Sequence, residues 1–367
     1  MNTSLQRSLP ALAYFDSSVM EAEWEKLWFK QWLYVCRRSE LAESGQYKVI
    51  EIGGQQVLMT QNKQGELKAF YNTCRHRGSE LCSDPDGKFN GGRIVCPYHR
   101  WAFSLDGELV NIPFADGEIN GQELGLYPVH SQTWGGNIYI NLSKTPSSEL
   151  GKDADPYFGL LDNWPLEELV VGHRHDYTLK CNWKVVWENY LECYHCPGLH
   201  PELCELVPLY KETLATDMLD GVSGTRDAVA EGVESWTMDG KAIGPNFPSL
   251  TADEVKAGHV YLSLPPNQWI VGHPDYVRQV SFMPIDAETT QISSEWLFSQ
   301  EFMDCPDLSP ERAIEFGELV LGQDAVACEI NQRGMTSLPH EAGFLVAPQE
   351  DDLGKYHDWY RALMENK

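Results

Sequence analysis

Two short segments that each pair one cysteine with one histidine constrain this chain more than any other feature. They read Cys74-Arg-His76 and Cys96-Pro-Tyr-His99, and each follows a short run with strand character. Glycine and proline mark their surroundings, so we expect both segments to form loops. Two such loops, brought together, present two thiolates and two imidazoles, which is a donor set for a metal site.

Two kinds of metal site suit this donor set. One is a structural zinc ion held by two cysteines and two histidines, and the other is a [2Fe–2S] cluster with two cysteines on one iron and two histidines on the other. Zinc fingers keep the cysteines together and the histidines together. Here each segment mixes one of each, which favours the iron–sulfur cluster over zinc.

The residues around these segments predict a small all-β domain over 45–145. Short apolar runs alternate there with turn dipeptides, and YKVIEI and QQVLMT flank Gly53-Gly54 as in a β-hairpin. Helix formers over 17–38 predict an amphipathic helix, and we expect residues 1–44 to pack on the second domain. Pro, Ser, Gly and Asp over 146–165 indicate a linker.

The second domain, over 166–367, mixes strands and helices. A strand (HDYTLKC) precedes a helix that Asn182 can cap, and that helix is expected to continue through His195. Extended runs between 259 and 299 predict an antiparallel meander, and a long helix is expected from Ser309-Pro310 to Gly334. The fold class is therefore α+β.

Charge and composition exclude several functions. The net charge of −26 repels phosphate backbones and anionic lipid surfaces, so nucleic-acid and membrane-surface roles are disfavoured. No stretch approaches the ~18 apolar residues of a membrane span, and the first residues lack a signal-peptide pattern. The ten cysteines are dispersed, as in a reducing compartment. We expect a cytoplasmic protein.

A second candidate metal site lies in the helix after Asn182. Glu192 and His195 are three residues apart, and the following Pro197-Gly198 lets the chain bend back so that His200 can reach the same point as His195. Two histidines and one carboxylate from elsewhere make the facial triad of a mononuclear Fe(II) site. The alternative is a zinc site using the nearby thiols of Cys193, Cys196 and Cys204.

These motifs together resemble a known family. Residues 74–78 and 96–101 closely resemble the two cluster loops in the Rieske domain of non-haem iron oxygenases, although Arg100 stands where that family commonly has glycine. The second site matches the family's catalytic motif of an acid, two residues, histidine, four residues, histidine. The resemblance implies an α+β chain in which a Rieske [2Fe–2S] domain precedes a helix-grip catalytic domain. The implied cluster ligands are Cys74, Cys96, His76 and His99.

The resemblance also implies roles in the second domain. His195 and His200 are the expected ligands of the mononuclear iron, and the third ligand comes from the long C-terminal helix. Asp324 is our choice, with Glu329 as the competitor. Glu192 is then the bridging acid that links His195 to His99 of the partner subunit, which requires a head-to-tail homotrimer.

Electrons for such an oxygenase come from NAD(P)H through a separate flavin and iron–sulfur reductase or a ferredoxin. The cluster region is locally basic although the chain is acidic, and we expect this patch to dock the electron donor. The patch residues singled out are Arg75, Arg77 and Arg93.

Residues 187–195 are similar to the choline, glycine-betaine and carnitine monooxygenase branch of the family. Aromatic faces bind quaternary ammonium groups through cation–π attraction, and Tyr190 is the expected cage residue. We therefore favour hydroxylation of an N-methyl group with loss of formaldehyde. The alternatives are mono- or dioxygenation of an aromatic acid, and a non-enzymatic zinc or ligand-binding protein. Other aromatic candidates in the second domain are Trp236, Tyr261, Trp269, Tyr276, Trp296 and Phe298.

Overall fold

The computed structural model describes residues 5–115, 123–151, 157–214, 224–225 and 228–365. The chain forms two compact units, Trp28–Leu150 and Met1–Leu27 together with Gly151–Lys367. Among the described residues, no helix is long and apolar enough to cross a membrane.

The N-terminal boundary differs from the expected one. Helix α1 (Ser17–Glu23) continues only as a π-helical turn, η2 (Trp24–Trp28), so the helix expected over 17–38 ends early. Strand β2 (Leu33–Arg37) then pairs antiparallel with β11 (Asn137–Asn141). Because β2 is buried along its length within that sheet, residues 28–44 belong to the β unit rather than to the second domain.

The unit Trp28–Leu150 is all-β, as predicted. Its hairpin of β3 and β4 turns at Gly53 and Gly54, which both have positive φ. The strands form three small antiparallel sheets, ordered β10-β11-β2, β5-β4-β3-β6 and β7-β8-β9. The remaining strands are β3 (Gln46–Ile52), β4 (Gln55–Gln61), β5 (Leu67–Tyr71), β6 (Asp86–Lys88), β7 (Arg93–Val95), β8 (Ala102–Ser104), β9 (Leu109–Asn111) and β10 (His130–Trp134), and the 3₁₀ turns are η3 (Arg38–Leu41) and η4 (Asn90–Gly92).

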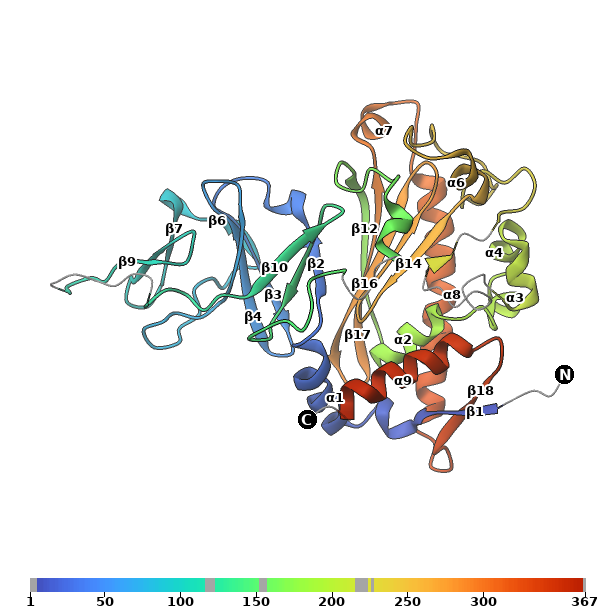
Figure 1. Cartoon of the computed structure of the whole chain (residues 1–367), viewed down its shortest axis with the longest axis horizontal. Helices are drawn as coiled ribbons and strands as arrows, with labels where there is room; N and C mark the ends of the chain where they lie inside the picture. Colours follow the sequence, from blue (N-terminus) through green and yellow to red (C-terminus); the bar gives the residue numbers. More distant parts are fainter. Residues whose placement is uncertain (1–4, 116–122, 152–156, 215–223, 226–227, 366–367) are drawn as a thin grey trace. The chain divides into compact units, whose positions relative to one another are not determined.

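The second unit is built on a six-stranded antiparallel sheet, ordered β12-β17-β16-β15-β14-β13 (Figure 1). The expected meander is confirmed, because β14 to β17 pair consecutively. A separate two-stranded sheet joins β1 to β18, near the two ends of the chain. The strands are β1 (Leu5–Pro10), β12 (Val170–Leu179), β13 (Gly224–Thr225), β14 (Val260–Leu264), β15 (Gln268–Gly272), β16 (Val277–Asp286), β17 (Thr289–Phe298) and β18 (Ala342–Val346).

The long helix α8 (Glu311–Met335) runs alongside this sheet and agrees with the prediction to within one residue at each end (Figure 1). A Cβ at Gly317 would lie 2.6 Å from Cζ2 of the fully buried Trp296, so glycine allows α8 to approach β17 closely. The other helices are η1 (Ala11–Tyr14), η5 (Tyr157–Leu161), α2 (Trp183–Tyr190), α3 (Cys196–Leu199), α4 (Pro201–Leu206), η6 (Pro208–Glu212), α6 (Ala252–Ala257), α7 (Gln300–Asp304) and α9 (Asp351–Glu365).

Helix α2 begins where the sequence predicts but ends earlier. The Asn182 side chain accepts a hydrogen bond from the backbone N–H of Lys184, which caps the helix. The helix stops at Tyr190 because the Glu192 carboxylate accepts hydrogen bonds from the backbone N–H groups of Tyr194 and His195, which form a local turn instead. Glu192 and His195 therefore share a turn and not a helix face.

A fully buried ion pair attaches the N-terminal helix to the second unit. Nζ of Lys184 lies 2.5 Å from Oε1 of Glu23, and both side chains are completely inaccessible. Glu23 also accepts hydrogen bonds from the Trp183 indole at 2.7 Å and the Tyr360 hydroxyl at 2.5 Å. These contacts link α1, α2 and α9, so α1 packs against the helices of the second domain.

Candidate metal centres and substrate cavity

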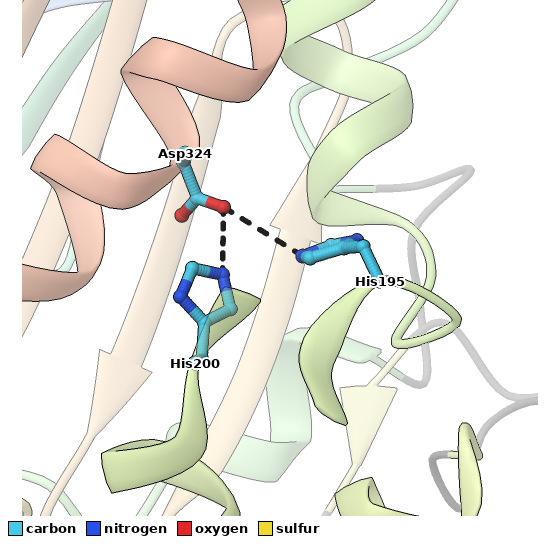
Figure 2. A group of neighbouring side chains, drawn as sticks. All are labelled: His195, His200 and Asp324. Carbon is cyan, nitrogen blue, oxygen red and sulfur yellow. Dashed lines mark hydrogen bonds and ion pairs between the residues drawn. The ribbon is translucent and has the colours of Figure 1, made fainter. Parts of the chain in front are cut away.

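Three side chains of the second unit converge on one point. Nε2 of His200 lies 2.8 Å from Oδ1 of Asp324, and Nε2 of His195 lies 3.6 Å from the same oxygen (Figure 2). The candidate ligand atoms of the three residues all lie within 4.8 Å of one another. Two histidines and one carboxylate on one side of a point match the facial triad that leaves open positions on Fe(II).

Separate elements bring these side chains together. His195 directly precedes α3, and His200 lies between α3 and α4, so the bend at Pro197-Gly198 places both imidazoles on one side. Asp324 projects from α8 and is 6% exposed. The competitor Glu329 accepts a hydrogen bond at 3.0 Å from the backbone N–H of Lys180 and does not belong to the cluster.

In both histidines, Nδ1 already has a hydrogen-bond partner. Nδ1 of His195 donates to Oε1 of Glu192 at 2.6 Å, and Nδ1 of His200 donates to the amide oxygen of Gln323 at 2.7 Å. With the proton on Nδ1, the lone pair of Nε2 is available for a metal. The donor set therefore fits a divalent metal in its orientation as well as in its composition.

The site also favours positive charge. Burial opposes a charged imidazole at His200, but the hydrogen bond and charge of Asp324 outweigh it, so the pKa of His200 is raised. Oδ1 of Asp324 accepts a further hydrogen bond at 2.8 Å from the amide of Asn189. Sequence reasoning missed Gln323 and Asn189 as supporting residues, and their only signal was a side-chain amide near a predicted ligand.

The zinc alternative at this site is wrong for two of its three thiols. Cys193 and Cys196 form a disulfide, and a disulfide sulfur is not a thiolate ligand. Cys204 is a free thiol buried in an apolar cluster that includes Leu203 and Val207.

In the β unit, the two predicted loops form matching turns around their cysteines. The N–H of Cys74 donates to the carbonyl of Ser79, and that of Cys96 donates to the carbonyl of Trp101, both at 2.8 Å. Arg100, in the second loop, adopts a left-handed φ of 63°, which explains why glycine suits this position.

The two cysteines and the two histidines predicted as cluster ligands lie in different environments. Cys74 and Cys96 are buried in the core of the unit, at 2% and 1% exposure. The rings of His76 and His99 lie at the surface with centroids 4.7 Å apart, and His76 stacks on Trp101. This separation into a buried thiol side and an outer imidazole side fits a [2Fe–2S] cluster with two cysteines on one iron and two histidines on the other.

The basic residues of the cluster loops differ in their contacts. The Arg75 guanidinium lies 4.0 Å from the centroid of the Tyr127 ring and also donates to the carbonyl of Glu123 at 3.3 Å. Arg77 is exposed and lies 5.6 Å from the Tyr98 ring, and Arg93 is exposed on β7. The charges of Arg77 and Arg93 are therefore more accessible to a partner protein than the charge of Arg75.

A cavity opens directly onto the candidate metal centre of the second unit. Its empty volume is about 840 Å³, including open solvent at its mouth. His195, His200 and Asp324 line one part of it, and apolar and aromatic side chains line the rest. Of the aromatic candidates, Tyr190, Trp236, Tyr261 and Trp269 line the cavity, whereas Tyr276, Trp296 and Phe298 are buried elsewhere in the unit.

The two domains and the triad define a two-centre oxygenase, and family comparisons agree. The sequence model of the ring hydroxylating alpha subunit (catalytic domain) family matches residues 166–366, and that of the Rieske [2Fe-2S] domain matches residues 31–128. The chain belongs to this family of Rieske non-haem iron oxygenases, which are oxidoreductases that carry a [2Fe–2S] cluster and a mononuclear iron. The non-enzymatic alternative is therefore wrong.

Several relatives share most of the chain. A glycine betaine monooxygenase oxygenase subunit of Chromohalobacter salexigens is 28% identical over 393 residues, covering 97% of this chain and 86% of the relative. A carnitine monooxygenase oxygenase subunit of Escherichia coli K12 is 35% identical over 205 residues, covering 54% of each chain.

Solved structures share the fold. The quaternary ammonium Rieske monooxygenase CntA with γ-butyrobetaine has a TM-score of 0.75 at 22% identity, covering 98% of this chain and 96% of that one. Naphthalene 1,2-dioxygenase from Rhodococcus sp. also has a TM-score of 0.75, at 19% identity, covering 97% and 94%.

Proposed function

We propose that this chain is the terminal oxygenase component that hydroxylates an N-methyl group of a quaternary ammonium substrate. The methyl carbon gains one oxygen atom of O₂, and the other leaves as water with two electrons from the reductase and two protons. The N-hydroxymethyl product then breaks its C–N bond and releases formaldehyde, a tertiary amine and a proton.

One observation carries this proposal. The cavity that contains His195, His200 and Asp324 is also lined by aromatic rings, so a bound onium group and the metal centre share one cavity. The relatives named glycine betaine and carnitine monooxygenase support the same substrate class. An aromatic acid is the competing substrate, and neither of these two relatives is named for one.

We assign His195, His200 and Asp324 as ligands of the mononuclear iron, and Cys74, His76, Cys96 and His99 as ligands of the cluster. When bound, these groups supply the electrons that O₂ activation needs. The side chains of the cavity bind the substrate and exclude water. Trp236 and Tyr261 line the cavity and are our candidates for holding the onium group through their rings, whereas Trp269 is stacked on Trp187 and Tyr190.

We further propose that Glu192 bridges the two kinds of centre across a trimer interface. Its carboxylate is hydrogen-bonded to Nδ1 of His195, and both residues also line a second cavity with an empty volume of about 970 Å³. That cavity gives His99 of the partner subunit a route to the other side of Glu192. The oligomeric state tests this point, because an active and strictly monomeric enzyme would contradict it.

We propose that Arg77 and Arg93 dock the acidic electron donor, with a smaller contribution from Arg75. Charge reversal at Arg77 and Arg93 should slow reduction of the cluster and flatten its dependence on salt. Reversal of Arg312, which is also exposed and lies on α8, serves as the matched control. Unchanged reduction kinetics in the double variant would remove this docking site.

The substrate proposal has a direct experiment. The holoenzyme is supplied with NAD(P)H and a surrogate reductase, and then offered N-methylated onium compounds and aromatic acids. Formaldehyde release in step with substrate loss is the expected result. Ring-hydroxylated product without formaldehyde would show that the aromatic-acid alternative is correct.

A further inference from the structure

The cavity contains a buried cation that has no anionic partner in the part of the chain that the structure describes. Arg278 lies on β16 and is only 6% exposed. Within the described residues, its Nε has no hydrogen-bond partner, and its Nη2 donates to the Tyr190 hydroxyl at 3.4 Å. No carboxylate of the described residues forms an ion pair with it, although its guanidinium lies 5.6 Å from the Trp296 ring centroid.

This arrangement is unfavourable in an empty site. Burying a charged group without a partner costs several kcal/mol, and a cation–π contact at this distance offsets only about 1 kcal/mol. A guanidinium presents a rigid fork of donors that matches the two oxygens of a carboxylate. The unpaired Nε of Arg278, together with its long hydrogen bond of 3.4 Å to Tyr190, therefore indicates that the missing partner is an anionic group of the ligand.

The position of Arg278 relates this group to the reaction centre. It is the only Lys or Arg among the described residues that line the cavity, and Asp324 and the two histidines line the same space. Among the described lining residues, the two that bear carboxyl groups are Glu192 and Asp324, which contact His195 and His200 respectively. A ligand that reaches Arg278 can therefore also present a methyl group to the metal centre.

Tyr190 is oriented to assist Arg278. One face of its ring stacks on Trp269 with centroids 4.2 Å apart, and its hydroxyl lies beside the guanidinium. Burial raises the pKa of the Tyr190 phenol well above its usual value, so the hydroxyl keeps its proton and can donate it in a hydrogen bond. Tyr190 can therefore take a polar role through its hydroxyl beside the cage role expected of its ring.

We propose that Arg278 and the Tyr190 hydroxyl bind the carboxylate of a zwitterionic substrate, while the aromatic rings of the cavity hold its onium end. The assignment of the onium end rests on the proposed function, whereas the assignment of the carboxylate end does not. It restricts the substrate to betaines, in which a quaternary ammonium group and a carboxylate occur in one molecule. Choline carries a hydroxyl group instead of the carboxylate, so Arg278 selects against it.

The test compares glycine betaine with choline on the holoenzyme. Arg278→Met keeps the length of the side chain and removes its charge and donors, and it is expected to weaken calorimetric binding of glycine betaine at least about 30-fold. Binding of choline should change by less than about threefold. Tyr190→Phe should show a smaller loss in the same direction, and Arg312→Met controls for the removal of one positive charge.

The outcomes separate the two proposals. If wild-type protein releases formaldehyde from onium substrates but Arg278→Met weakens glycine betaine and choline equally, the carboxylate site is wrong and the proposed function stands. If wild-type protein binds benzoate and not betaines, and Arg278→Met abolishes that binding, the carboxylate site stands and the proposed function is wrong. A thermal melt of each variant identifies any that fail to fold. If Arg278→Met fails to fold, Arg278→Lys provides the same comparison, because it keeps the charge but loses the paired donors of the guanidinium.

Discussion

Oε1 of Glu192 lies 2.6 Å from Nδ1 of His195, and the opposite nitrogen of the same imidazole faces Asp324 at 3.6 Å. The carboxylate thus fixes both the proton and the orientation of the ring.

Glu192→Gln should retain both iron centres but slow electron transfer to the mononuclear site. Loss of an outer carboxylate that orients a metal-bound histidine typically costs about 10- to 100-fold in activity or metal affinity. The measurement is the rate at which a reduced cluster is reoxidised in a single turnover, with iron content determined in parallel. Glu205→Gln, on the exposed side of α4, is the control. A wild-type rate of reoxidation in Glu192→Gln would contradict the bridging role.

Glu23→Gln should strongly destabilise the second unit. It leaves the buried Lys184 ammonium without its counter-charge, and breaking a buried pair on one side costs about 3–5 kcal/mol. The double variant Glu23→Leu with Lys184→Met removes both charges and should recover most of this loss. Chemical denaturation measures both, with exposed Glu21→Gln as the control. Equal stability of the single and double variants would argue against a buried charge.

Two glycines of α8 should respond in opposite directions to the same substitution. Gly317→Ala places a Cβ 2.6 Å from the Trp296 ring, and we expect a loss of about 1–3 kcal/mol in the free energy of unfolding. Gly322→Ala meets no atom within 4 Å and should stabilise the helix by up to about 1 kcal/mol. The paired melts test how closely α8 packs on β17, and a neutral Gly317→Ala would show that the packing is looser.

His273 should make stability depend on pH. Burial, together with the positive charges of His259 and Arg278, holds the pKa of His273 well below its usual value. The unfolded chain therefore binds a proton that the folded chain excludes, so this contribution is present above about pH 6.5 and is lost as the pH falls below it. His273→Gln should flatten the decline in unfolding free energy between about pH 7 and pH 5. An unchanged slope would mean that His273 takes up its proton in the folded state.

Local patterns predicted what depends on nearby residues. The ligand spacings, the Asn182 cap and the strands of the meander follow from short stretches of sequence, and the structure places the three triad residues together as expected. What could not be predicted depends on tertiary contact. Glu23 meets Lys184 across 161 positions, and Gln323 meets His200 across 123, so neither pair leaves a local signal.

Other differences arise where local and tertiary preferences compete. The helix after Asn182 is expected to continue through His195, yet the Glu192 carboxylate accepts hydrogen bonds from the backbone and α2 ends at Tyr190. Arg278 lies on β16, where a single charged residue is normally expected to face solvent, and only the tertiary structure shows that it is buried and lines the cavity.

The central claim is that the chain holds two different iron centres, the mononuclear one on His195, His200 and Asp324. The most direct measurement is iron and acid-labile sulfide per chain in anaerobically purified wild-type protein and in Asp324→Asn, with the cluster monitored by its electron paramagnetic resonance signal. We predict about three iron atoms and about two sulfides in the wild type, and loss of about one iron with an unchanged cluster signal in the variant. Zinc without sulfide in the wild type, or full iron content in Asp324→Asn, would contradict the account.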